Sequence, residues 1–79
     1  MNEMAVVLLE RSAKRFGIPK DDILGDDRFP EVVAARHDWW KAMRLKGWSY
    51  SRIARTACCH HTTIMYALKK GGPDAVRAA

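Results

Sequence analysis

The hydrophobic positions of this chain recur with the three-to-four-residue spacing of amphipathic helices. Residues 2–16 place such a stripe on one helix: Ala5, Leu8, Leu9, Ser12, Ala13 and Phe16. Residues 31–46 place another: Val32, Ala35, Trp39, Ala42 and Met43. The sequence lacks the strict alternation of a half-buried strand. The pattern therefore predicts a compact all-α domain of about four to five helices.

Glycine and proline divide the rest of the first half. Gly17 suits the left-handed conformation that ends a helix, and Gly47 is expected to end the long helix. Pro19 opens a short second helix in which Ile23 and Leu24 are expected to point inward. Residues 25–30 read as a loop.

Residues 49–70 predict two helices joined by a tight turn. Ser49 is a candidate N-cap for a helix over residues 50–57, which a break at Cys58-Cys59 separates from a helix over residues 60–70. Residues 71–73, Gly-Gly-Pro, are expected to end the second helix. We assign residues 1–72 to one domain and residues 73–79 to a flexible tail.

The spacing within this unit is that of a helix-turn-helix. Ile53-Ala54 supplies an apolar residue beside a small one, so that the second helix can cross the first, and Ile64 and Ala67 then face inward with Leu68 beside them. Cys58 stands where glycine is usual, and because cysteine resists a positive φ we expect an altered turn. The outward face carries His61, Thr62, Met65, Tyr66 and Lys69, and His60 and Thr63 flank it.

Charge is divided unevenly along the chain. Residues 1–40 hold six Lys and Arg against eight Asp and Glu, whereas residues 41–79 hold eight against one, so the halves carry −2 and +7. A concentrated basic surface favours a polyanionic partner such as nucleic acid, although basic residues can also serve only to keep a small domain soluble. We expect double-stranded DNA as the partner.

Composition excludes several other classes. The chain has no apolar run of transmembrane length, no export leader and no nucleotide-binding glycine loop, so we expect a cytoplasmic protein with no membrane partner and no NTPase activity. The adjacent cysteines are expected to stay reduced. Four consecutive residues, Cys58-Cys59-His60-His61, point in different directions and do not suit a metal. We expect no enzyme activity, cofactor or small-molecule substrate.

Side-chain chemistry assigns roles within the basic half. Thr62 and Thr63 offer hydroxyl and methyl groups to base edges, and His60, His61 and Tyr66 offer further hydrogen bonds. Long cations around this face suit phosphates: Lys46, Arg52, Arg55, Lys69 and Lys70.

His61-Thr62-Thr63-Ile64 resembles the Asp-His-Thr-Thr-Val signature of the C-terminal DNA-binding domain of the bacterial chromosomal replication initiator DnaA. Phe16-Gly17-Ile18 and Asp22-Ile23-Leu24-Gly25 resemble the opening "FGI…DLLG" of that family, and residues 49–54 resemble its "SLPEIG". These ordered matches cover about residues 5–70. The resemblance implies an all-α, Trp-repressor-like helix-turn-helix, here as a stand-alone domain.

The resemblance also implies roles for single residues. His61, Thr62 and Thr63 would read bases in the major groove, and Arg28 would enter the minor groove. Arg36 and His37 match a polar pair that contacts DNA at the start of the long helix, and we place them with the phosphate contacts. The chain departs from the family at three places: Asp26-Asp27 makes the loop acidic, Cys58-Cys59 replaces Gly-Arg, and His60 replaces an aspartate that suits cytosine N4.

These features predict sequence-specific binding of double-stranded DNA by a transcriptional regulator. It would be phage-derived, activate phage or gene-transfer-agent-like genes, and have RNA polymerase or another regulatory protein as a further partner. The alternatives are a replication-initiation accessory protein, an RNA-binding protein, and a protein-interaction module on an inherited scaffold. In that last case the Val6-Val7 edge and Trp40 could contact an acidic protein, and Thr62→Ala would cost nothing.

Overall fold

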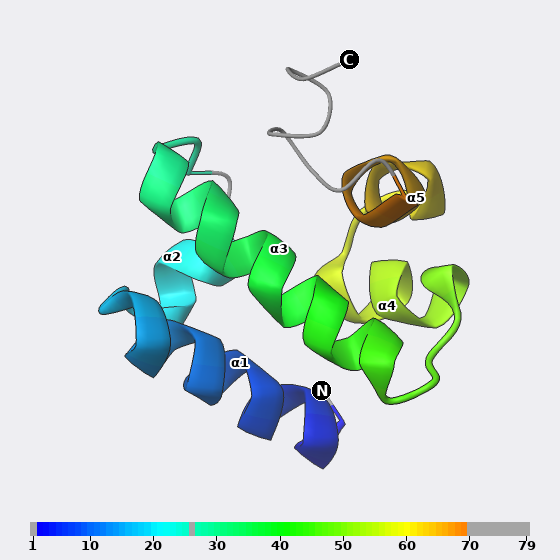
Figure 1. Cartoon of the computed structure of the whole chain (residues 1–79), viewed down its shortest axis with the longest axis horizontal. Helices are drawn as coiled ribbons and strands as arrows, with labels where there is room; N and C mark the ends of the chain where they lie inside the picture. The colour runs from blue at the N-terminus through cyan, green and yellow to red at the C-terminus, as the bar shows by residue number, and fades with distance from the viewer. Residues whose placement is uncertain (1, 26, 70–79) are drawn as a thin grey trace.

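Five helices make up the part of the chain that the computed structural model describes, residues 2–25 and 27–69 (Figure 1). They are α1 (Glu3–Phe16), α2 (Lys20–Leu24), α3 (Pro30–Leu45), α4 (Tyr50–Ala57) and α5 (His61–Lys69). The predicted all-α class is confirmed, with α1 to α4 starting and ending within one residue of the predicted bounds. The proposed stop at residues 71–73 and the tail 73–79 lie outside the described residues.

Local capping groups explain where the helices begin and end. The Asn2 side chain accepts a hydrogen bond from the Met4 N–H at 2.8 Å and so caps α1. Gly17 ends α1 in the left-handed region at φ 66°. Ser49 Oγ accepts from the Arg52 N–H at 3.1 Å, which confirms Ser49 as the N-cap of α4.

The long helix α3 lies at the centre of the fold, with α1 and α2 packed on one side and α4 and α5 on the other (Figure 1). The predicted stripes supply most of the core, which Trp40 and Trp48 complete. Trp39 is 1 % exposed, and its Nε1 donates to the Ala5 carbonyl oxygen at 3.0 Å, which ties α3 to α1. Trp40 is also buried, at 5 % exposed, but its Nε1 has no partner among the described residues.

Two predicted core residues are exposed instead. Phe16 is the last residue of α1 and is 37 % exposed, because the chain turns away at Gly17 before the ring can be covered. Leu24 ends the five-residue α2 and is 42 % exposed, since Ile23 alone fills the core position of that short helix. The predictions for these two side chains were wrong. No helix in residues 2–25 and 27–69 has the length and apolarity needed to cross a bilayer.

Candidate nucleic-acid interface

Helices α4 and α5 pack across each other as the spacing predicts. Ile53 and Ala54 of α4 are buried against Ile64 and Ala67 of α5, and all four belong to the core. Because both helices are fixed through their apolar faces, the opposite face of α5 is turned outward. The helix-turn-helix arrangement therefore rests on four side chains that the sequence pattern identified.

The turn between these helices keeps the left-handed form that we expected cysteine to disturb. Cys58 has φ 59° and ψ 44°, and its N–H points to the Ala54 and Arg55 carbonyl oxygens at the end of α4. A residue with a Cβ in this conformation costs about 1–2 kcal/mol relative to the right-handed region. The prediction of an altered turn was wrong, because packing of α4 against α5 outweighs this preference. Burial raises the pKa of the neighbouring Cys59 thiol, and the charge interaction with Cys58 raises it further. The Cys59 thiol is therefore protonated at neutral pH.

His60 begins α5 as a capping residue. Its Nδ1 accepts the Thr62 backbone N–H at 3.2 Å and lies 2.7 Å from Thr62 Oγ1. Since the backbone N–H can only donate, Nδ1 is the acceptor of that bond. With Nδ1 as the acceptor, Nε2 is the ring nitrogen that carries a proton and can donate. The sequence did not reveal this role, because histidine is not among the usual N-cap residues.

The first turn of α5 presents the predicted base-reading side chains to solvent. His61, Thr62 and Thr63 are exposed, and the His60 and His61 rings lie 4.6 Å apart between centroids. Tyr66, one turn further along, is 58 % exposed. All five candidates for base contacts are exposed, four of them in α5 and His60 directly before it.

A groove of about 450 Å³ joins this helix to the loop before α3. We call it the turn groove; it is lined by Ile23, Leu24, Gly25, Arg28, Arg36, Trp39, Trp40, Ala57, Cys58, Cys59 and Thr63. Arg28 and Thr63 therefore face one hollow although they are far apart in sequence. The loop arginine lies on the side of the molecule from which the first turn of α5 projects.

Arg36 has an intramolecular role that the sequence did not show. Its Nε donates to the Ile23 carbonyl oxygen at 2.8 Å, and Nη2 donates to those of Asp22 and Gly25 at 3.2 and 2.7 Å. These carbonyls belong to the end of α2, where helices leave oxygens without partners. Arg36 therefore ties α2 and the following loop to α3, and within residues 2–25 and 27–69 its Nη1 makes no hydrogen bond.

His37 lies on another flank of α3. It is half-buried, its ring centroid is 5.2 Å from that of Trp40, and burial together with the Arg36 charge lowers its pKa below the ordinary 6.5. It lines a different groove, beside Ala67 and Leu68, so the structure does not bring it to the turn groove. At neutral pH it is an uncharged ring.

The predicted phosphate-binding cations of α3 and α4 are exposed. Lys46 follows α3 directly, and Arg55 lies in the last turn of α4. The Arg52 guanidinium carbon lies 3.7 Å from the centroid of the Trp48 ring, so the guanidinium makes a cation–π contact with a buried indole. The side chain of Lys69, and Lys70 as a whole, lie outside the described residues.

Comparison with known proteins gives one family. The profile described as the bacterial DnaA protein helix-turn-helix matches residues 8–70, which include α2 to α5 and most of α1. Searches of curated proteins and of solved structures give no match. Among residues 2–25 and 27–69, no three His, Cys, Asp or Glu side chains gather as a metal site would require.

Proposed function

This chain belongs to the bacterial DnaA helix-turn-helix family, a non-catalytic DNA-binding module, and from that premise we propose that it recognises a specific sequence in double-stranded DNA. In this proposal α5 enters the major groove with its first turn leading, as recognition helices do. The observation that carries the proposal is the exposure of three polar side chains in the first turn of α5: His61, Thr62 and Thr63.

The capping geometry of His60 bears on which base is read. Because Nδ1 is used by Thr62, the ring can offer DNA only the Nε2 hydrogen, which is a donor. The aspartate of the resembled signature would be an acceptor suited to cytosine N4. We therefore propose that the position facing His60 carries an acceptor edge, such as guanine O6 or N7, and that this chain recognises a different sequence from one with aspartate there.

Phosphate contacts are assigned to the cations that surround α4 and α5. Arg52 is the best prepared, because stacking on Trp48 fixes the guanidinium plane while its edge N–H groups remain available to phosphate oxygens. Arg55, Lys46, Lys69 and Lys70 complete the set. Arg36 could add only Nη1, and His37 only an uncharged N–H.

Arg28 is proposed as the minor-groove residue. It is exposed and shares the turn groove with Thr63, so it can approach the groove next to the one that α5 enters. The neighbouring Asp27 accepts the Phe29 backbone N–H at 3.1 Å, which turns this carboxylate toward its own loop. The acidic charge that precedes Arg28 is expected to weaken, but not to remove, its attraction to DNA.

We assign this binding to transcriptional regulation, including regulation of phage-derived or gene-transfer-agent-like genes, with RNA polymerase or another regulatory protein as partner. Genome-wide mapping of bound sites separates this role from the alternatives. Sites at promoters support it, sites clustered at a replication origin favour an accessory role in initiation, and no sites would favour an interaction module.

The residue roles are tested with one duplex selected from a randomised pool and a scrambled duplex of equal length. Thr62→Ala is expected to cost about 1–3 kcal/mol on the selected duplex and little on the scrambled one. Arg55→Gln is expected to weaken binding to both and to reduce the salt slope by about one unit. Lys20→Gln, an exposed lysine on α2, is the charge-matched control and should change neither. Equal losses on both duplexes for Thr62→Ala would refute its base-reading role.

A further inference from the structure

A second hollowed surface lies on the flank of α3 that faces away from the turn groove. It consists of two adjoining grooves of about 430 and 310 Å³, the first between α3 and the α4–α5 pair, the second between α1 and α3. Both are lined by Asp38, Lys41 and Leu45, which form one stripe of α3 at helical spacing. We call the two grooves together the lateral groove.

The lateral groove exposes apolar side chains that a folded domain normally covers. Leu45, on the shared stripe, is 78 % exposed, and Phe16 on the rim is 37 % exposed. The partly buried Leu68 and Tyr50 continue this apolar surface toward α5 and α4. Contiguous apolar surface with a polar rim is typical of sites that bind another protein.

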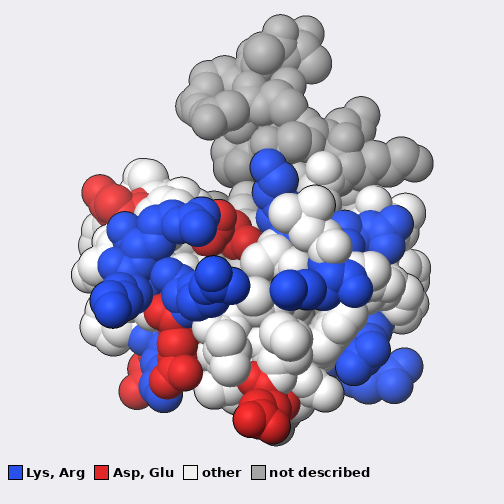
Figure 2. Space-filling view, turned by 60° about the horizontal axis from the view of Figure 1, so that its bottom comes forward, with Lys and Arg blue, Asp and Glu red and all other residues white. Residues whose placement is uncertain are grey.

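The rim of this groove is basic. Its lining includes four cations, Arg11, Arg15, Lys41 and Arg44, and one acid, Asp38. Figure 2 shows one face of the molecule, on which Lys and Arg lie on both sides of an uncharged area, with Asp and Glu among the cations at the left and at the lower edge.

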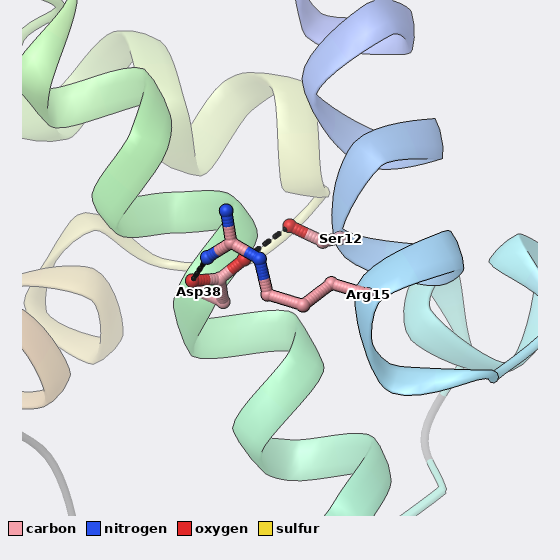
Figure 3. Close-up of polar contacts among 3 residues, drawn as sticks. All are labelled: Ser12, Arg15 and Asp38. Atoms are coloured by element: carbon pink, nitrogen blue, oxygen red, sulfur yellow. Dashed lines mark hydrogen bonds and ion pairs between the residues drawn. The ribbon is translucent and has the colours of Figure 1, made fainter.

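The single acid of the lining is already satisfied within the chain. Asp38 accepts the Ser12 hydroxyl at 2.7 Å and the Arg15 guanidinium at 3.1 Å, as Figure 3 shows. Arg11 and Lys41 make no ion pair with any of the described residues. The groove therefore offers a partner apolar contacts bordered by positive charge.

The lateral groove and the turn groove share no lining residue. Helix α5 contributes Thr63 to the turn groove, but Ala67 and Leu68 to the lateral groove. A molecule seated in the lateral groove would leave His61 and Thr62 accessible. DNA and a second partner could therefore be held at the same time.

We propose that the lateral groove docks an acidic amphipathic helix from a partner protein. The lining runs along α3 from Ala34 to Leu45, which is about 16 Å or three helical turns. A helix with apolar residues at i, i+3, i+4 and i+7 would cover Leu45 and Phe16, and Glu or Asp on its flanks would face Arg11 and Lys41. A second copy of this chain, at +5, would repel the basic rim. The inference goes beyond DNA binding and does not depend on it.

The probe is a synthetic 18-residue peptide with four leucines at those spacings and glutamates on its flanks. One control peptide replaces the glutamates by lysines, and another replaces the leucines by serines. Binding to the full chain is followed by amide chemical shifts, first alone and then with a DNA duplex present. We expect shifts confined to the lateral groove, retained with DNA, and absent with either control peptide. Three results would overturn the proposal: equal binding of the serine peptide, chemical-shift changes on the first turn of α5, or no binding at a tenfold excess of peptide over protein.

Variants separate docking from general charge attraction. Lys41→Gln should weaken the peptide about two- to fivefold, and Lys14→Gln, a matched loss of an exposed lysine outside the groove, should not. Leu45→Ser should weaken it about tenfold without changing the melting temperature, because the side chain is exposed.

The same Leu45→Ser variant without peptide identifies other occupants. Loss of self-association would mean that a second copy fills the groove, and shifts in residues 70–79 would mean that the chain's own C-terminal residues do. Either result would replace the partner helix as the occupant.

Discussion

Replacing Cys58 by glycine should stabilise the protein, although it removes a side chain. Cys58 is the residue with positive φ that is not glycine among residues 2–25 and 27–69, and it is exposed, so little packing is lost. Glycine has no Cβ, so the substitution removes the cost of about 1–2 kcal/mol that cysteine has in the left-handed conformation. Glycine also gains freedom in the unfolded chain, which costs about 0.4–1 kcal/mol. The net expectation is a gain of about 0.5–1 kcal/mol, or a few degrees in Tm for a domain of this size.

The assay is urea and thermal unfolding followed by far-ultraviolet circular dichroism under reducing conditions. Cys58→Ala keeps a Cβ in the same conformation and should stay within about 0.5 kcal/mol of the original chain. Gly17→Ala is the reverse experiment: Gly17 has φ +66° and an added Cβ there would meet nothing within 4 Å, so only the conformational cost remains. Gly17→Ala should lower the free energy of unfolding by about as much as Cys58→Gly raises it. If Cys58→Gly proves no more stable than Cys58→Ala, the reasoning about the turn is refuted.

Three further predictions concern stability. Trp39→Phe should lower the free energy of unfolding by roughly 2 kcal/mol more than Trp40→Phe in urea titrations. The first change breaks the hydrogen bond to Ala5, whereas the second removes a buried N–H that has no partner among the described residues. Equal losses would contradict this. Burial lowers the pKa of His37 below its ordinary 6.5, so on acidification the unfolded chain takes up the proton first. Stability should therefore fall as the pH drops through 6.5 toward the lowered pKa, and His37→Gln should flatten that part of a pH series of melting temperatures. Ser49→Ala removes the N-cap of α4 and should lower the free energy of unfolding by about 1 kcal/mol. Ser51→Ala, at an exposed position that does not cap the helix, should lower it less.

The features that sequence predicts well here are those set by local chemistry. Helical periodicity placed the buried faces, since Ile53 and Ile64 must both be covered if two short helices are to pack. Ser49 and Gly17 fixed helix ends because a side-chain acceptor and a residue without Cβ act within one turn. The family resemblance stated from three short motifs is likewise confirmed by the profile match.

The features that sequence missed depend on contacts between distant segments. Arg36 matches a DNA-contacting position of the resembled family, but no local pattern shows that its long side chain donates three hydrogen bonds to the end of α2. His60 caps α5 through a ring orientation that residue type alone does not give. Cys58 adopts a positive φ although cysteine prefers a negative one. The packing of α4 against α5, a tertiary contact, outweighs that preference. The base-reading and minor-groove roles stay predictions.

Selection of bound duplexes from a randomised DNA pool at about 0.15 M salt tests the central claim most directly. The account predicts enrichment of one motif, with a base that presents a hydrogen-bond acceptor, such as guanine, where the His60 ring would point. His60→Asp should abolish that preference. Binding without any enriched motif, which disappears as salt rises, would contradict sequence reading by α5 and leave only attraction to a basic surface.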